Sequence, residues 1–501
     1  MTLNKKEQRG MRQFLGNKYE KHVEKISSET EVIQLDPRRW IGLWVVLSGS
    51  FLAGMDGFIV NVALPSIQKD LTTDFASLQF VVAGYALIYA VLLVTGGRLG
   101  DLYGRKRIFL VGMASFVLAS ALCGFALHPL ALVMARFLQG AAAALLFPQI
   151  LGLVRVTFTG RERDQAFGLY GMTIGLSQIS GLVLGSLLLA TNIFGLGWRA
   201  LFLINVPIGV VALTLTIFFV REATLPGQQK LDLGGVGLAT LGLGLLIFPL
   251  IEGREAGWPW WTFLSLTMAF FLLFGFFFYE RAVETRNGAP LLSRALLENS
   301  AFLRGLLMVL LFFSATGAFL LVITFYLQSG LGQPAPIAGL TTLPFALGVF
   351  LASFAATPIK KRLGTYVLSG GAGSMIMGIL MFIGSIVISG SKPTGLALLP
   401  GMFLIGFGFG LILSPLMSVL LGSIEAVHAS VASGMIGTCM QTGLSLGVAF
   451  TGVIFFSLLT SHATYTQAFL WSLGSLLGIL LLALLLIFSL PQEKQHIKVV
   501  E

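Results

Sequence analysis

Two ionisable residues lie inside long apolar stretches of the sequence, where a charge is costly. Asp56 falls in the apolar run 41–63, and Arg136 falls in the run 130–152. An apolar environment disfavours the ionised form of a carboxyl group, so Asp56 is a candidate for proton exchange near neutral pH. The same carboxylate could attract a cationic ligand, or could only fix helix packing by pairing with the backbone or with a cation.

Arg136 is the natural partner for that carboxylate. A guanidinium does not lose its proton in proteins, so Arg136 must face a polar cavity or a partner. We predict that it tunes the protonation of Asp56, binds an anion or orients water. A purely structural or snorkelling cation is the alternative. Asp56 and Arg136 together form the predicted proton-coupling site.

The most specific local pattern is the charged loop at 97–107, between two apolar runs. Its glycines, Gly97 and Gly104 among them, permit a tight turn from one helix to the next. Asp101 can cap a helix or lie at the positive end of a helix dipole. With Arg98 and Arg105 it forms a charged clasp that we predict to be a gate. The alternative is a loop whose charges only set membrane topology.

Signatures of enzymatic chemistry are missing from the sequence. It contains no GxxxxGK[ST] phosphate loop, which argues against ATP hydrolysis. The five histidines are not at metal-ligand spacing. We therefore predict that the protein is not an enzyme and needs no cofactor.

The elements that must position these residues are membrane-spanning helices. Hydrophobic residues make up 56% of the chain and charged residues 11%, against about 25% charged in soluble domains. Apolar runs of about 20 residues, the length that crosses a bilayer, recur about fourteen times. They lie at 41–63, 78–97, 108–126, 130–152, 166–189, 199–220, 232–251, 260–279, 304–327, 337–356, 366–389, 395–418, 431–458 and 467–490. The predicted fold class is an all-α integral membrane protein.

The distribution of basic residues predicts the orientation of these spans. If the N-terminus is cytoplasmic, 27 of the 32 Lys and Arg residues lie on the cytoplasmic side and 4 on the other side. This is the positive-inside pattern, and it explains the net charge of +10 without a nucleic-acid partner. We predict a multi-pass protein of the inner (plasma) membrane, surrounded by membrane lipids, with both termini in the cytoplasm.

The spans fall into two halves separated by an insertion. A weaker echo of the 97–107 loop occurs at 358–364, and both loops lie between the second and third helices of a six-helix half if 232–279 is an insertion. Duplicated halves with a site between them are common in transporters. The predicted division is a cytoplasmic tail (1–39), a six-helix bundle (40–221), two inserted helices (222–280), a cytoplasmic connection (281–303), a second six-helix bundle (304–490) and a cytoplasmic tail (491–501).

Several motifs resemble those of one family, the major facilitator superfamily, and within it the fourteen-span drug:proton antiporter-2 group. The 97–107 loop is similar to the superfamily loop G-x-L-x-D-x-x-G-R-K/R. The run from Asp56 to Pro65 resembles the group's first-span pattern LDxTIVNVALP, and the run from Arg136 to Gly140 with Pro148 resembles its fourth-span pattern RxxQG…P. The stretch 198–209 and parts of 326–344 are similar as well. The resemblance covers about residues 40–490.

This resemblance implies a fold and roles for particular residues. The implied fold is two six-helix bundles plus two extra helices, working by alternating access and driven by the proton gradient. Asp56 would be the proton site, Arg136 its relay partner, and Asp101 with Arg105 part of the cytoplasmic gate. The residues assigned to the substrate cavity are Asn61, Gln139, Gln149, Gln178, Phe325, Gln328 and Gln441.

The sequence also departs from the family pattern. The fifth-span motif G-P-x-x-G-G keeps only Gly181 and Gly185, which puts strict antiport in doubt. The span at 431–458 keeps Gln441 but lacks the usual Asn and Arg, which favours a less polar cavity and a lipophilic substrate.

The leading hypothesis is proton-coupled export of lipophilic small molecules or drugs, cations among them, by a monomer. The second is export or flipping of a lipid, a siderophore or an endogenous metabolite, which substrate competition would distinguish. The third is a membrane sensor or scaffold that transports nothing, which would tolerate Asp56→Asn.

Overall fold

The computed structural model describes residues 38–73, 75–222, 232–253, 256–285, 294–389, 395–425 and 428–487. Over these ranges the chain is helical, with no strand, and 14 helices are long and apolar enough to cross a membrane. The predicted fold class and number of spans are therefore confirmed. The predicted tails, and residues 286–293 of the connection, lie outside the described ranges.

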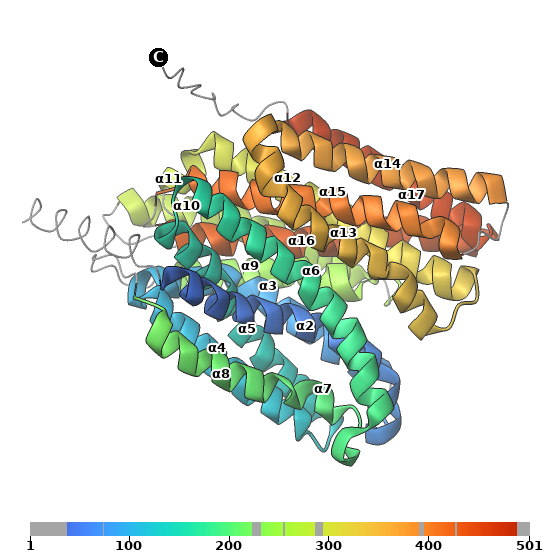
Figure 1. The fold of residues 1–501 in the computed structure, drawn as a ribbon, viewed down its shortest axis with the longest axis horizontal. Coiled ribbons are helices and arrows are strands. Elements are labelled where there is room, and N and C mark those ends of the chain that lie inside the picture. The colour runs from blue at the N-terminus through green and yellow to red at the C-terminus, as the bar shows by residue number, and fades with distance from the viewer. Residues whose placement is uncertain are drawn as a thin grey trace, which may run out of the picture.

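The first half of the chain forms one bundle, at the bottom of Figure 1. Its helices are α2 (Arg39–Leu71), α3 (Phe75–Tyr103), α4 (Arg105–Gly124), α5 (Pro129–Thr157), α6 (Gly160–Thr191), α7 (Arg199–Leu203) and α8 (Asn205–Phe219). The predicted single span at 199–220 is broken after Leu203. Pro207 explains the break, because a proline ring clashes with the carbonyl four residues earlier, which here belongs to Leu203.

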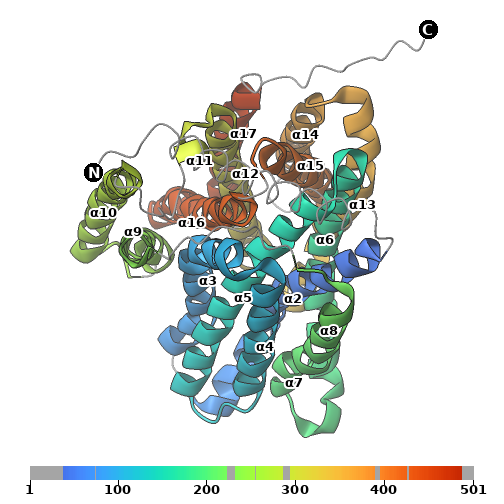
Figure 2. The same ribbon diagram turned by 90° about the vertical axis from the view of Figure 1, so that its left-hand side faces the viewer.

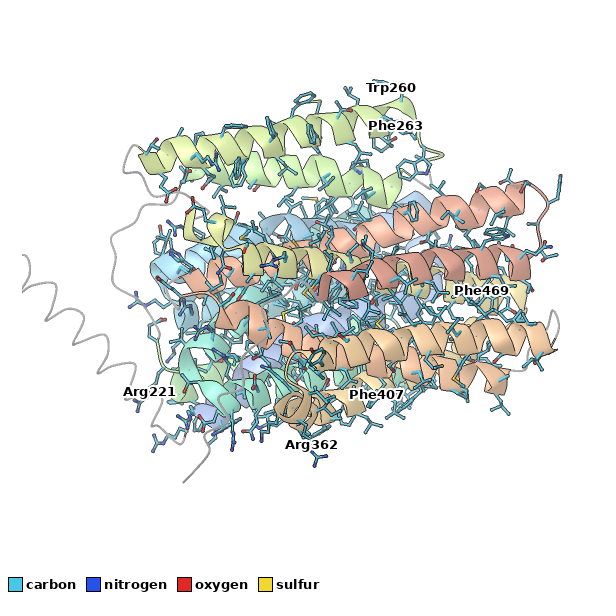
Figure 3. The ribbon with its side chains drawn as sticks, turned by 90° about the horizontal axis from the view of Figure 1, so that it is seen from above. Arg221, Trp260, Phe263, Arg362, Phe407 and Phe469 are labelled. Carbon is cyan, nitrogen blue, oxygen red and sulfur yellow. The ribbon has the colours of Figure 1, made fainter. Side chains whose placement is uncertain are left out.

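The last half forms the second bundle, and two further helices flank the pair. The second bundle contains α12 (Ser300–Phe325), η2 (Tyr326–Gly330), α13 (Ala335–Leu363), α14 (Tyr366–Ser389), α15 (Gly395–Gly422), α16 (Ala429–Thr460) and α17 (Tyr465–Ile487). The flanking helices are α9 (Leu233–Glu252) and α10 (Trp260–Thr285), and a short α11 (Arg294–Glu298) precedes α12. Figure 3 shows α9 and α10 as a separate pair on one flank, with Trp260 and Phe263 near its outer edge.

The outer surface carries many large apolar side chains. Phe218 is 73% exposed, Ile388 is 87% exposed and Leu485 is 67% exposed. A soluble monomer does not expose so much contiguous apolar surface, whereas a bilayer covers it. The protein is thus a multi-pass membrane protein.

The two bundles meet at one end only. We call this the basic end; it carries the start of α2 at Arg39, the turn at Gly104 and the turn at Gly364, and it lies on the left of Figure 1. The described contacts between the bundles join α3 and α5 to α16, and α6 to α13 and α15. Toward the other end the two bundles diverge (Figure 1).

Candidate functional site

Asp56 and Arg136 meet in the interior of the first bundle. Both side chains are buried, at 0% and 1% exposure, and Arg136 Nη1 pairs with Asp56 Oδ2. Arg136 also donates to the carbonyl of Val81 at 2.8 Å and to Gln139 Oε1 at 2.6 Å. Its guanidinium lies 4.3 Å from the ring centroid of Tyr85. Four contacts therefore fix one cation against one carboxylate.

Two amides complete the shell around the second carboxylate oxygen. Gln139 Nε2 donates to Asp56 Oδ1 at 2.8 Å, and Asn205 Nδ2 donates to the same oxygen at 2.9 Å. Ser120 Oγ accepts from Gln139 at 2.9 Å and so orients that amide. These three donors occupy both oxygens of the Asp56 carboxylate and fix the side chain in place.

Glycines bring α6 against α2 beside this carboxylate. A Cβ atom on Gly181 would lie 2.9 Å from the carbonyl oxygen of Met55 and 2.9 Å from Phe58 Cβ. A Cβ on Gly54 would lie 2.4 Å from Ser177 Oγ. Gly185, one turn further along α6, is buried as well. The glycines that remain of the fifth-span motif thus allow α6 to cover the helix turn that carries Asp56.

The charged loop closes the basic end. Asp101 Oδ1 pairs with Arg105 Nη2 at 2.8 Å, with 6% and 1% of the two side chains exposed. Asp101 Oδ2 accepts from the backbone N–H of Val431 at 3.1 Å, and Arg105 Nε donates to Ser430 Oγ at 2.6 Å. Val431 and Ser430 lie in the first turn of α16, where free N–H groups favour an anion. The two residues thus join the first bundle to the second.

The other residues of the loop make this closure possible. A Cβ on Gly97 would lie 2.3 Å from the carbonyl oxygen of Ser430, so only glycine allows α3 and α16 to approach this closely. Gly104 has a φ of 100°, a conformation that other residues rarely adopt, and α4 starts directly after it. Arg98 is 5% exposed and interacts electrostatically with Asp101.

A second contact closes the basic end between α6 of the first bundle and α13 of the second. Lys360, in the echo at 358–364, donates to Asp164 Oδ1 at 2.7 Å, with 10% and 22% of the side chains exposed. Ser418 Oγ donates to the same carboxylate oxygen. Arg155 donates to the carbonyl of Ile424 at 2.9 Å. The two loops that resemble each other in sequence therefore each dock on the opposite bundle.

The residues assigned to the substrate cavity lie in different environments. Gln139 belongs to the Asp56 cluster, and Gln149 is buried, donating to the carbonyl of Gly96 at 2.8 Å in the contact between α5 and α3. Gln178, Phe325 and Gln441 are half-buried, and Gln328 is exposed. The side chain of Asn61 lies outside the described part of the structure.

Sequence reasoning did not assign roles to Asn205, Ser120 or Tyr85. Asn205 carried a signal, because an amide within an apolar run needs a partner. Ser120 and Tyr85 carried none, since hydroxyl residues are tolerated in membrane helices. Among the described residues there is no group of three or more His, Cys, Asp and Glu side chains that could hold a metal ion.

Known proteins share both the sequence and the fold. Residues 46–279 match the Major Facilitator Superfamily. The probable actinorhodin transporter of Streptomyces coelicolor is 39% identical over 428 residues, which is 85% of this chain and 74% of the relative. The puromycin resistance protein pur8 of Streptomyces alboniger is 34% identical, covering 91% of this chain and 92% of the relative. The tetracenomycin C resistance and export protein of Streptomyces glaucescens is 32% identical, covering 85% and 78%.

Solved structures agree on the fold. The proton:xylose symporter XylE superposes with a TM-score of 0.63 at 15% identity, covering 90% of this chain and 95% of that one. The human organic anion transporter MFSD10 superposes with a TM-score of 0.62 at 14% identity, covering 90% and 100%. These likenesses confirm the predicted two-bundle fold. By its close relatives and by its fold, the chain belongs to the Major Facilitator Superfamily of transporters.

Proposed function

We propose that this protein is a proton-coupled secondary transporter that exports lipophilic small molecules, cations among them, by alternating access. The two bundles, at 40–221 and 304–490, are the moving bodies, and the transporter works as a monomer without a cofactor. The basic end faces the cytoplasm of a bacterial cell whose inner membrane holds the protein, with both termini on that side. The buried pair of Asp56 and Arg136 carries this proposal.

The coupling step follows from the geometry of that pair. With the basic end closed, Asp56 is ionised and held by Arg136, Gln139 and Asn205. A proton that reaches Asp56 removes the negative charge that attracts Arg136. The Arg136 guanidinium is then left without its partner in the interior of the first bundle. A buried, unpaired guanidinium is costly, so it must find a new partner or water. Protonation therefore changes the energy of one conformation relative to the other, which is what coupling requires.

The gate belongs to the same proposal. Asp101 with Arg105, and Asp164 with Lys360, hold the basic end shut in the described conformation. Opening toward the cytoplasm breaks both contacts, and closure restores them after the substrate has bound.

The nature of the substrate is inferred from the relatives. Three of them are named for transport of, or resistance to, individual antibiotics, and a fourth, from Mycobacterium tuberculosis, is named a multidrug resistance protein. The second candidate is export of one compound made by the cell itself. The actinorhodin relative is named for a single compound, and its 39% identity over 428 residues supports a transporter with one substrate.

The test uses the purified protein in liposomes with an imposed pH gradient and a fluorescent lipophilic cation. We expect gradient-driven movement by the wild type and its loss in Asp56→Asn. The matched control is Asp70→Asn at the far end of the same helix. Hydrogen bonds from Arg199 and Trp198 lower the pKa of Asp70, so this carboxyl stays ionised at neutral pH and its replacement leaves coupling intact.

Three outcomes would change the proposal. Movement that Asp56→Asn does not alter would remove this carboxylate from coupling. Movement that ignores the pH gradient would remove proton coupling altogether. No movement of any lipophilic cation by a folded wild type, together with export of a single anionic or neutral compound, would favour the second candidate.

A further inference from the structure

The two inserted helices contact both bundles at the basic end. Helix α9 packs against α3 of the first bundle and against α16 of the second, as the view from that end shows (Figure 2). The buried members of this contact are Val94 of α3, Ala239 of α9 and Phe276 of α10, and Met435 of α16 packs against them. The hairpin therefore covers the seam that Asp101 and Arg105 close.

The base of the hairpin holds two carboxylates close together. Asp232 caps α9 by accepting from the backbone N–H of Gly235 at 3.0 Å, and it accepts from Tyr279 Oη at 2.9 Å. Glu280 of α10 is only 2% exposed. A Cβ on Gly235 would lie 2.4 Å from Glu280 Oε1 and 2.7 Å from Asp232 Oδ2, so both carboxylates converge on the same point.

Glu280 is buried and Asp232 is partly buried, and two carboxylates so close together need a cation. Arg98 of α3 supplies it, because this nearly buried side chain interacts electrostatically with both Glu280 and Asp232, as well as with Asp101. Removing one partner from such a group leaves an uncompensated charge, so the interaction resists separation. Arg98 lies three residues before Asp101, so the anchor of the hairpin adjoins the gate.

The hairpin is thus attached unequally to the two bundles. Its contact with α3 is both apolar and ionic, whereas the described apolar contact with α16 runs through Met435. When the bundles separate at the basic end, α9 can keep only one of these neighbours.

We infer that α9 and α10 form a strap that the charges of Arg98, Asp232 and Glu280 anchor to α3, and that the strap holds the basic end closed through its apolar contact with α16. On this inference the insertion sets the balance between the two conformations of the transporter. It goes beyond the proposed function, because it concerns the conformational balance and requires no particular substrate or ion.

The test measures the distance between the bundles with spin labels, on a seam away from the strap. Arg161→Cys and Arg362→Cys place labels on exposed sites at the basic end, with Cys439→Ala to remove the half-buried cysteine and the buried Cys123 retained. Double electron–electron resonance then gives the ratio of closed to open populations in liposomes. Transport is not part of this readout, so its outcome is independent of the proposed function.

We expect Glu280→Gln to raise the open-to-closed ratio by about fivefold or more, a typical size for coupling between two sites. The matched control is Glu284→Gln, one turn further along α10 and only half-buried, which we expect to leave the ratio unchanged. The double variant Val236→Ala/Leu238→Ala weakens the apolar contact, leaves every charge in place, and should shift the ratio in the same direction.

An unchanged ratio in either folded test variant overturns the inference and makes the hairpin a passive, lipid-facing element. A shift of equal size in Glu284→Gln also overturns it, because the loss of any negative charge from α10 would then have the same effect. If Glu280→Gln does not yield a monodisperse protein, the double variant decides alone.

Discussion

The two bundles share a topology but bury different chemistry. Among the described residues, every buried charged or amide side chain lies before residue 281. These residues are Asp56, Arg98, Arg105, Arg136, Gln139, Gln149, Asn205 and Glu280. In the second bundle the buried polar residues are serines and threonines, and the core is built from aromatic rings.

The aromatic core of the second bundle is continuous. Tyr326 stacks on Phe469 with ring centroids 4.3 Å apart, and Phe382 contacts both Phe469 and Phe319. Ring pairs of this kind add packing energy without any charge that could respond to a proton. The comparison teaches that the buried charges, to which the proposed function assigns coupling and gating, are concentrated in the first bundle and in the insertion.

The largest effect should come from breaking the buried ion pair. Arg136→Gln leaves Asp56 without its cation, and breaking a buried pair costs about 3–5 kcal/mol. We expect a large fall in the thermal midpoint and the loss of gradient-driven transport. Thermal unfolding in detergent and the liposome assay measure the two effects. If Asp56→Asn/Arg136→Gln is no more stable than Arg136→Gln alone, the uncompensated charge is not the cause.

A cavity in the second bundle should destabilise the protein to a similar degree without touching coupling. Phe469→Ala removes the ring that stacks on Tyr326, and Phe→Ala in a core costs about 3–5 kcal/mol. We expect a lower thermal midpoint but an unchanged dependence of transport on the pH gradient in the protein that remains folded. An altered gradient dependence would break the division between the bundles.

A smaller change within the first bundle should affect coupling more than stability. Asn205→Ala removes one donor to Asp56, and the loss of a buried hydrogen bond costs about 1–3 kcal/mol. With one donor fewer, the Asp56 carboxylate is held less firmly, so transport driven by the pH gradient should weaken in the liposome assay. Ser120→Ala is the control, since Ser120 contacts both amides but not the carboxylate. An equal loss in the two variants would show that all the groups around the carboxylate act together, and not the direct donor alone.

The two closing contacts should differ in strength according to burial. Asp101→Asn breaks a pair that is nearly buried, whereas Asp164→Asn breaks one that is partly solvated and worth about 1 kcal/mol or less. Spin-label distances should therefore show a larger gain in open population for Asp101→Asn. A larger gain for Asp164→Asn would place the main closing contact on the seam between α6 and α13.

Much of this organisation was predictable from the sequence. Apolar run length sets the number of spans, and the cost of a charge in lipid singles out Asp56 and Arg136 without any structure. The break after Leu203 could have been predicted from Pro207. The role of Arg98 could not, because it depends on Asp232 and Glu280, which lie more than a hundred residues away in an insertion whose docking position no periodicity encodes. Gln149 likewise looks like a cavity residue in sequence and lies between two helices in space.

The smallest effect concerns His428, the residue before α16 and close to the gate. Burial lowers the pKa of His428, and Arg98 lowers it further, while Asp101 and Glu425 oppose the change. Separation of α3 from α16 removes the burial, so in the open conformation the pKa returns toward its ordinary value of about 6.5. The open conformation then binds the proton more tightly than the closed one. The closed population should be at its full value above about pH 6.5 and should fall as the pH drops through and below that value.

Spin-label distances measured from pH 8 downward test this prediction, with His428→Gln as the variant that cannot titrate. The difference between the two pH profiles isolates His428 from Asp56, and identical profiles would remove this histidine from the gate.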